Sequence, residues 1–212
     1  MQYQEVIEKL ISFDCFEYKN PCPVSRGCGT AFWADISGNV KLITAAHIPW
    51  PAQLARPGNG EKLLVKWKMK SGSSGEGAAV FYPHPTNPGI DYASISFCDK
   101  SDAPPTFPFS IAKTNVCKDE AIVSFGFPGP YTQAQADSTT AIVDEVEDCG
   151  QRILVAGRAC GGYSGGPSFQ FCEEGTVKNE VIGLMSGAPQ IQIMEERNLG
   201  DAYVLVSPLK FE

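Results

Sequence analysis

The sequence predicts an all-β protein, and three observations indicate this class. Hydrophobic residues make up 43% and charged residues 19% of the 212 residues, which is typical of a folded chain with a sizeable core. The chain contains 21 glycines and 16 prolines, enough for many turns between short strands. Short apolar runs separated by turn residues fill most of its length, a pattern typical of an all-β barrel or sandwich.

The first predicted element is a short amphipathic helix over Met1–Leu10. Its apolar face consists of residues that recur at helical spacing, namely Val6, Ile7, Leu10 and Ile11. The segment lacks the basic start and the apolar centre of a secretory signal. The following segment, Asn20–Gly29, is rich in proline, glycine and cysteine, and we expect it to be a turn region.

Eleven segments after this turn region have the composition and the flanking turn residues of strands. They are Gly29–Asp35, Val40–Thr44, Lys62–Met69, Ala78–Tyr82, Ala93–Phe97, Ala121–Gly126, Ser138–Glu147, Arg152–Ala156, Gly166–Phe171, Val181–Ser186 and Tyr203–Val206. Ser71–Gly77 (SGSSGEG) is expected to be a flexible hairpin loop between two of them.

The segment Lys100–Pro108 is expected to connect two lobes, because its three prolines cannot continue a strand ladder. It leaves five of these predicted strands before it and six after it. We therefore expect a single domain over residues 1–212. Its N-terminal lobe would span about 24–100, its linker about 101–110 and its C-terminal lobe about 111–209.

The chain is acidic, with a formal net charge of −7 and a pI of about 4.9. An acidic surface repels phosphate backbones, which argues against a nucleic acid partner. No apolar run approaches the roughly 18 residues that a membrane-spanning helix needs, so no membrane partner is expected.

Eight cysteines are present: Cys15, Cys22, Cys28, Cys98, Cys117, Cys149, Cys160 and Cys172. There is no Cys-x-x-Cys pair and there are only two histidines, so no metal site is expected. A disulfide framework stays open, but buried free thiols are favoured because the chain shows no export signal.

The strongest local motif is Gly161–Pro167 (GGYSGGP), which surrounds Ser164 with glycines. Gly162 has no side chain, so it can turn its N–H toward the point in space that the N–H of Ser164 faces. Two such N–H groups form an oxyanion hole, which stabilises negative charge on a carbonyl oxygen under attack. A plain glycine-rich turn is the alternative interpretation of this motif alone.

Two other segments place candidate catalytic side chains at the ends of predicted strands. His47 ends the run Leu42–His47 (LITAAH), and an imidazole can take and return a proton near neutral pH. Asp91 lies in Asn87–Ile95 (NPGIDYASI), and a carboxylate that accepts from an imidazole fixes its tautomer. Each residue alone has a structural alternative: a hydrogen-bonded histidine at a strand end, and an aspartate that caps a turn.

Taken together, these motifs resemble the chymotrypsin/trypsin-like serine protease family. TAAH, the Asp-x-Ala strand and Gly-x-Ser-Gly-Gly-Pro occur in the family's order, over roughly Gly27–Leu209. The resemblance implies two six-stranded antiparallel β-barrels with an active site between them. It also implies a serine endopeptidase that needs no cofactor and acts on a protein or peptide substrate.

The family's catalytic roles carry over to matching positions. The resemblance implies that Ser164 is the nucleophile, that His47 is the general base and acid, and that Asp91 orients His47. The backbone N–H groups of Gly162 and Ser164 would bind the oxyanion.

The resemblance also implies a substrate-binding region. Val181–Gly187 is similar to the segment that pairs with the substrate backbone, and it would place Ser186 near the catalytic aspartate. Gly187 and Ala188 would line the specificity pocket. Arg158 stands where the family has the residue at the base of this pocket, and an arginine there would favour an acidic residue before the scissile bond. The alternative is that Arg158 points outward or pairs with a neighbouring acid.

The chain departs from the family pattern in several places. Tyr163 stands where many secreted members have an aspartate that pairs with a newly cut N-terminal amine, so activation by N-terminal cleavage is not expected. The family's usual disulfides are missing; for example, Ile48 follows His47 in place of a cysteine. These missing disulfides favour a cytoplasmic location. His84, between two prolines, is the rival base and is expected to be structural or exposed.

Two alternatives to a constitutively active protease stay open. One is an inactive protease-fold module that acts through partner binding. The other is a latent protease that an activating partner protein, or the ordering of a loop, switches on. A collapsed oxyanion loop in the free protein would favour the latent enzyme.

Overall fold

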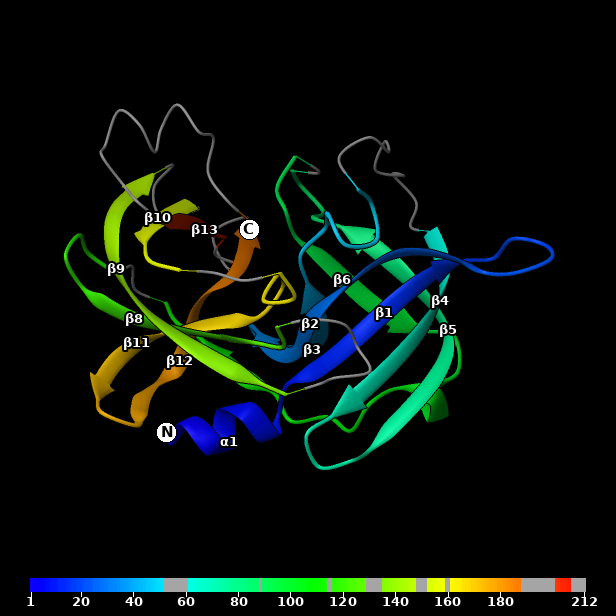
Figure 1. Cartoon of the computed structure of the whole chain (residues 1–212), viewed down its shortest axis with the longest axis horizontal. Coiled ribbons are helices and arrows are strands. Elements are labelled where there is room, and N and C mark those ends of the chain that lie inside the picture. Colours follow the sequence, from blue (N-terminus) through cyan, green and yellow to red (C-terminus); the bar gives the residue numbers. More distant parts are fainter. Residues whose placement is uncertain are drawn as a thin grey trace.

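The computed structural model describes residues 1–51, 61–87, 89–113, 116–128, 135–147, 152–158, 161–187 and 201–206. Within these residues it has thirteen strands, one α-helix and one 3-10 helix, with the strands in two groups that lie side by side (Figure 1). The predicted all-β class and the predicted short N-terminal helix are therefore confirmed.

The N-terminal helix α1 (Tyr3–Glu8) is capped at its start and tied to the C-terminal half of the chain. The N–H of Gln2 donates to Oε2 of Glu5 at 3.1 Å, which gives a partner to a donor that the helix itself leaves unpaired. The terminal amine of Met1 donates to the carbonyl oxygen of Val177 at 2.8 Å, and the N–H of Val177 donates back to Met1 at 2.9 Å. The helix therefore lies against the C-terminal half while the chain continues into the N-terminal half.

The first six strands close into an antiparallel barrel. They are β1 (Ile11–Glu17), β2 (Val24–Ile36), β3 (Asn39–Thr44), β4 (Glu61–Met69), β5 (Ser74–Pro83) and β6 (Ala93–Phe97). Neighbours pair in the order β1-β4-β5-β6-β3-β2, and β1 pairs with β2 to close the ring. Alternate residues of β4 are buried, as expected for a strand with one face toward a barrel interior: Leu63, Val65, Trp67 and Met69. One predicted six-stranded barrel is thus confirmed.

The barrel begins earlier in the chain than the sequence predicted. Strand β1 lies before the expected lobe boundary near residue 24 and supplies one of the six barrel strands. Its residues Ile11, Phe13 and Cys15 alternate along the strand and are all buried. Ile11 pairs with Ala31 of β2 and with Met69 of β4, and it therefore belongs to the barrel rather than to the apolar face of the helix.

Strand β2 also extends into the segment that was expected to be a turn region. It starts at Val24, and Gly29 is a strand residue that leaves room for close neighbours. A Cβ at Gly29 would overlap the side chain of Ile48 and would lie 2.8 Å from the carbonyl oxygen of Ser164. Glycine here therefore marks a close approach of backbones rather than a turn.

The expected linker over residues 101–110 includes the end of a 3-10 helix, η1 (Lys100–Asp102), and the start of strand β7 (Phe109–Ile111). Residues 103–108 between them lie outside any helix or strand. Strand β7 pairs in parallel with β2 on one side and with β12 (Thr176–Gly187) on the other. This short strand therefore joins both groups of strands into one continuous sheet.

The other six strands form the C-terminal group. Besides β12 they are β8 (Ala121–Gly126), β9 (Asp137–Glu147), β10 (Arg152–Ala156), β11 (Pro167–Glu173) and β13 (Ala202–Val206). They pair in the order β12-β11-β8-β9-β10-β13, and β12 also pairs with β13. These pairings are compatible with the second barrel that the sequence predicts. The group has its own buried apolar cluster, which includes Ile122, Val143, Val155, Tyr203 and Leu205.

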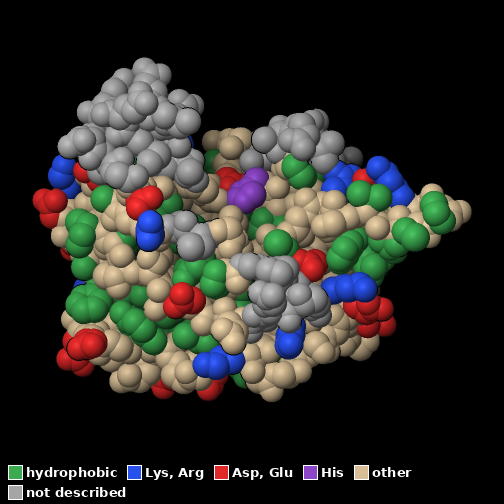
Figure 2. Space-filling view, viewed as in Figure 1, with side chains coloured by type: hydrophobic (Ala, Val, Ile, Leu, Met, Phe, Trp, Pro, Cys, Tyr) green, Lys and Arg blue, Asp and Glu red, His purple; other side chains and the backbone are tan. Residues whose placement is uncertain are grey.

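The surface has a mixed charge pattern on the face seen in Figure 2. There, acidic and basic side chains are interspersed with apolar ones over both groups of strands. None of the helices in the described residues is long and apolar enough to cross a membrane.

Candidate active site

The pairing of β3 with β6 brings His47 and Asp91 together. In this antiparallel pair Thr44, the last residue of β3, lies opposite Ala93, the first residue of β6. Residues just after Thr44 must therefore lie next to residues just before Ala93. His47 and Asp91 occupy these two positions, one on each turn.

A tight turn with a buried base carries His47. Ala45 and Ala46 have no exposed surface, and their carbonyl oxygens accept from the N–H groups of Ile48 at 3.3 Å and Trp50 at 3.1 Å. Ile48 and Trp50 are both buried in the barrel core. Small residues before His47 let the turn lie on the barrel, and large apolar residues after it hold the turn in place.

Asp91 holds His47 through two hydrogen bonds. Its Oδ1 accepts from the backbone N–H of His47 at 2.7 Å, and its Oδ2 lies 2.7 Å from Nδ1 of the ring. A proton on Nδ1 that points at the carboxylate leaves Nε2 as the acceptor on the other side of the ring. The His47 side chain is 39% exposed, whereas that of Asp91 is only 16% exposed.

The carboxyl group of Asp91 is held in its charged form. Burial acts to raise its pKa, but the hydrogen bonds and positive charge of His47, together with the hydroxyl of Ser186, hold the pKa below its ordinary value of 3.8. The carboxylate therefore stays an acceptor for a proton on Nδ1 of His47, an arrangement that fixes the tautomer of the ring.

Ser186 brings the C-terminal group of strands to the same aspartate. Its hydroxyl donates to Oδ2 of Asp91 at 2.6 Å. In the β11–β12 pair, Pro167 lies opposite Leu184, so residues just before Pro167 run beside residues just after Leu184. Ser164 and Ser186 occupy these positions, and the pairing therefore places the loop of Ser164 beside the contact with Asp91.

Backbone contacts fix the Ser164 loop between the two groups of strands. On one side, the N–H of Gly165 donates to the carbonyl oxygen of Met185 at 2.7 Å. On the other side, the N–H of Thr30 donates to the carbonyl oxygen of Ser164 at 2.9 Å. Gly165 has a φ of +82°, and a Cβ there would overlap Thr30 and Thr44 and lie 2.9 Å from the N–H nitrogen of Ala45. Glycine is thus required both for its backbone conformation and for its contact with the turn that carries His47.

The Ser164 hydroxyl and the His47 ring lie on adjacent loops, but no hydrogen bond joins these two described residues. Catalytic hydrogen bonds in proteins without bound substrate are often long and shorten only in the complex. The arrangement therefore places a half-buried serine hydroxyl on a loop next to an oriented imidazole.

The residues predicted to form an oxyanion hole lie on the same loop. Gly162 has a φ of +96°, in the left-handed region that favours glycine. The N–H of Gly166 donates to the carbonyl oxygen of Tyr163 at 2.8 Å, so the N–H of Ser164 on the same planar peptide points the opposite way. Within the described part of the chain, no acceptor binds the N–H of Gly162 or of Ser164.

The predicted substrate-binding residues are in part described. Gly187 ends β12, half-buried, with open space where a Cβ would lie. The side chain of Arg158 is 84% exposed and its Nε lies 3.3 Å from Oδ2 of Asp201. This ion pair matches the alternative that the sequence leaves open for Arg158, in which its side chain points outward or pairs with a neighbouring acid. Ala188 lies outside the described residues.

His84, the rival base, supports the turn that leads to Asp91. Its side chain is buried, and its Nδ1 accepts from the N–H groups of Thr86 at 3.4 Å and Asn87 at 3.2 Å. Its ring packs edge-on against Tyr92 with centroids 5.4 Å apart. Burial lowers the pKa of His84 below its ordinary value of 6.5, and the charge of Lys41 lowers it further. We therefore interpret His84 as a structural residue of the turn that leads to Asp91.

One residue that sequence reasoning missed is Thr30, whose side chain contacts the loop that is predicted to form an oxyanion hole. Its hydroxyl donates to the carbonyl oxygen of Gly162 at 2.8 Å, across 132 positions of the sequence. No local pattern distinguishes this threonine from others in strands, because the contact arises only when the two groups of strands meet.

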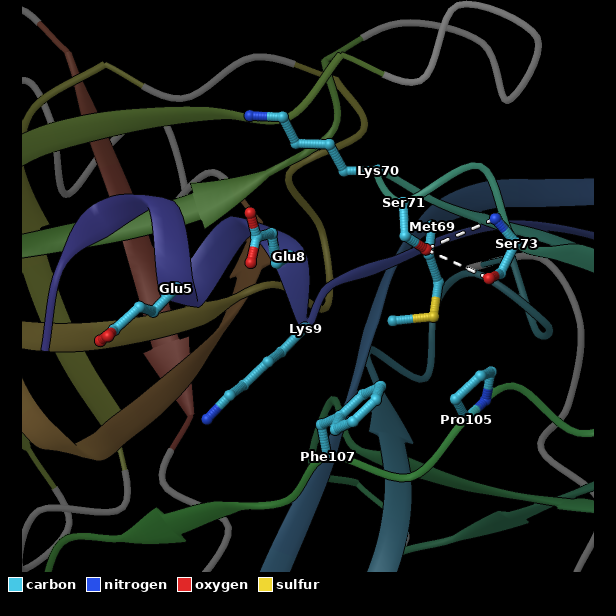
Figure 3. Close-up of a pocket in the computed structure, with 9 residues that line it drawn as sticks. All are labelled: Glu5, Glu8, Lys9, Met69, Lys70, Ser71, Ser73, Pro105 and Phe107. Atoms are coloured by element: carbon cyan, nitrogen blue, oxygen red, sulfur yellow. Dashed lines mark hydrogen bonds between the residues drawn. The ribbon is translucent and has the colours of Figure 1, made fainter.

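A cavity of about 730 Å³ lies away from these residues, between α1, the β4–β5 turn and the segment before β7 (Figure 3). Lys9 and Phe107 line it together with Met69 and Lys70. In Figure 3 the charged side chains of α1 lie on one side and Phe107 and Pro105 on the other. This cavity shares no residue with the predicted active site.

Metal-binding side chains do not gather at the site: the described residues contain no group of three His, Cys, Asp or Glu side chains that could hold an ion. Six of the eight cysteines lie in described segments, and all six are free thiols there. Neither the family models nor the curated proteins compared with this chain give a match.

Proposed function

We propose that the protein is a serine endopeptidase that hydrolyses peptide bonds through an acyl-enzyme on Ser164. The observation that carries the proposal is the hydrogen-bonded series from Ser186 to Asp91 to His47, with the Ser164 loop packed against the turn of His47. An oriented and charge-stabilised imidazole beside a serine on a glycine-rich loop has the chemistry of an activated nucleophile.

In the acylation step, Nε2 of His47 takes the hydroxyl proton of Ser164 while Oγ attacks the scissile carbonyl carbon. The carbonyl oxygen becomes an oxyanion, and the N–H groups of Gly162 and Ser164 bind it. When the intermediate collapses, the C–N bond breaks and the imidazolium returns the proton to the leaving amine.

Deacylation repeats these steps with water. His47 takes a proton from the water as its oxygen attacks the acyl carbon, and Ser164 leaves with that proton as its hydroxyl is restored. Asp91 keeps the proton on Nδ1 in place throughout and stabilises the imidazolium through Oδ2. The substrate that these residues fit is a protein or peptide, and no cofactor takes part in these steps.

The test is covalent labelling with a fluorophosphonate probe, followed by cleavage of a peptide library. We expect the native chain to be labelled, and Ser164→Ala and His47→Ala not to be labelled. Ser71→Ala, which changes an exposed hydroxyl in a turn, is the matched control and should be labelled as the native chain is. Absence of labelling in the folded native chain would overturn the proposal of an active enzyme and favour either a latent enzyme that needs a trigger or a protease fold reused for binding.

A preference for an acidic residue before the scissile bond is a separate part of the proposal and depends on Arg158. Its guanidinium pairs with Asp201 on an exposed surface, where screening by water weakens an ion pair. The peptide library decides this point: loss of an acidic preference in Arg158→Ala would support a role in the specificity pocket. An unchanged preference would remove Arg158 from the site and leave the catalytic proposal standing.

A further inference from the structure

Thr30 joins four segments of the chain through its hydrogen bonds, and it is completely buried. Its N–H donates to the carbonyl oxygen of Ser164 at 2.9 Å, and its hydroxyl donates to that of Gly162 at 2.8 Å. The hydroxyl accepts from the N–H of Phe127 at 3.1 Å. The Thr30 carbonyl oxygen accepts from the hydroxyl of Thr44 at 2.8 Å. A hydroxyl has one proton, so the donor from Phe127 directs that proton toward Gly162.

The contacts of Thr30 fall on both sides of the predicted nucleophile. They hold the carbonyl groups of Gly162 and Ser164, and thereby fix the two peptide planes that flank the Tyr163–Ser164 peptide. The Tyr163–Ser164 peptide is itself held by the N–H of Gly166. Three consecutive peptide planes are therefore fixed, and with them the direction of the Ser164 N–H.

The loop needs such support because its own sequence does not fix it. Gly162 has a φ of +96°, and glycine has many other conformations of similar energy open to it. Tyr163 is buried in the apolar cluster of the C-terminal group and has no carboxylate with which to form an ion pair. Thr30 reaches the loop from β2, which belongs to the N-terminal barrel.

We propose that Thr30 is a positioning residue that helps to hold the N–H group of Ser164 in the orientation that binds an oxyanion. The inference rests on the proposed endopeptidase function, because it gives this N–H group its catalytic role. It deepens that function by assigning the orientation of the oxyanion loop to one side chain of the other half of the molecule.

The experiment compares Thr30→Val, which keeps the shape but removes the hydroxyl, with Thr30→Ser, which keeps the hydroxyl. We expect kcat/KM for a peptide substrate to fall about 10- to 100-fold in Thr30→Val, since small displacements of catalytic groups have effects of this size. Thr30→Ser should stay within about threefold of the native chain, in keeping with the retained hydrogen bond. Ser124→Ala removes another buried hydroxyl, bonded to Ser168 and Tyr203, and controls for a general loss of stability.

A second readout separates positioning from a purely structural role. A peptide aldehyde forms an oxyanion when Ser164 adds to it, so its affinity should fall in step with kcat/KM in Thr30→Val. KM for the peptide substrate should change by less than about twofold, because ground-state binding does not use the oxyanion hole. If Thr30→Val and Ser124→Ala had the same kcat/KM as each other and the same affinity for the aldehyde, the proposal would be overturned.

A measurement without turnover keeps this proposal distinct from the proposed function. The amide NMR signals of Gly162 and Ser164 should shift in Thr30→Val and stay in place in Thr30→Ser, whether or not the native chain cleaves peptides. Unmoved signals would overturn the positioning role even in an active enzyme, whereas a native chain that is neither labelled nor active would overturn the function alone. Thr30→Ala replaces Thr30→Val if valine prevents folding, because alanine also lacks the hydroxyl and introduces no added bulk.

Discussion

The hydroxyl of Ser186 donates a 2.6 Å hydrogen bond to Oδ2 of Asp91, across 95 positions of the sequence. Asp91 precedes the last strand of the N-terminal barrel, and Ser186 lies near the end of β12 in the C-terminal group. The same carboxylate oxygen faces the ring of His47. The charge state of this aspartate therefore depends on both halves of the molecule.

The first prediction concerns Ser186→Ala, which should lower the free energy of unfolding at pH 7 by about 1.5–3 kcal/mol, the range for a hydrogen bond to a charged group. Because the pKa of Asp91 is below 3.8 in the folded state, its contribution is present above that pH and is lost as the pH falls through the folded value. The difference from the native chain should thus shrink between pH 7 and pH 3 in urea denaturation. Ser186→Thr, which keeps the hydroxyl, is the control, and a difference that is equal at both pH values would contradict this account.

Asp91→Asn should lower kcat by about 10³–10⁴-fold, as expected when the tautomer of a catalytic histidine is no longer fixed. The carboxylate accepts from the backbone and the ring of His47 and from Ser186, whereas a carboxamide has one acceptor oxygen and a donor group in place of the other. Steady-state kinetics measure the effect. Asp35→Asn is the matched control, because Asp35 accepts from the N–H of Gly38 in an exposed turn; a similar loss in both variants would rule out this role for Asp91.

Gly165→Ala should destabilise the fold far more than Gly38→Ala. Both glycines have a positive φ, +82° and +85°, so alanine at either position has a backbone cost of about 1–2 kcal/mol. At Gly38 a Cβ would meet nothing within 4 Å, but at Gly165 it would overlap Thr30 and Thr44. We expect a total loss of more than about 3 kcal/mol at Gly165. Chemical denaturation of the two variants tests this, and equal losses would mean that the loop relaxes away from the His47 turn.

The stability of the chain should fall as the pH drops below about 6.5, in part because of His84. The pKa of His84 is lowered in the folded state, so the unfolded chain binds this proton more readily. Acidification through this range therefore stabilises the unfolded chain relative to the folded one. Protonation would also remove the Nδ1 acceptor of the Thr86 and Asn87 N–H groups. Two other side chains act on His84: the charge of Lys41 also lowers its pKa, and the ring of Tyr92 packs against its imidazole.

Replacing this histidine with asparagine gives the matched variant for that pH dependence. In His84→Asn the side-chain oxygen can take the position of Nδ1 as an acceptor, and it does not titrate. The melting temperature of His84→Asn should therefore depend less on pH between 7 and 5 than that of the native chain. The same pH dependence in both proteins would show that other groups determine it.

The sequence predicts the class of fold and the positions of the site loops because both depend on local patterns. Strands β4 and β6 are recognisable from short apolar runs between turn residues. His47 and Asp91 stand at the ends of such runs, and antiparallel pairing then brings them together. Two of the glycines around Ser164, Gly162 and Gly165, have a positive φ that favours glycine, and this local preference is also visible in the sequence.

Features that depend on tertiary contacts were not predictable in this way. Strand β1 was missed because Ile11 also fits the helical spacing of the residues before it, and packing in the barrel decides between the two. Residues 24–28 of β2 fall in the segment predicted to be a turn region, and the close approach of Ile48 and Ser164 to Gly29 is a tertiary contact. The hydrogen bond of Thr30 to Gly162 and the ion pair of Arg158 with Asp201 likewise join segments that are distant in the sequence.

Strand β7 has a consequence for how the molecule unfolds. This strand pairs with β2 on one edge and with β12 on the other. Neither group of strands therefore has an unpaired strand edge where β7 lies. The N-terminal segment adds a second tie, since Met1 pairs with Val177 while the next strand completes the barrel. Opening one half removes hydrogen-bond partners from the other, which favours a single cooperative transition over two separate ones. Calorimetric and van 't Hoff enthalpies of unfolding should therefore agree for the whole chain.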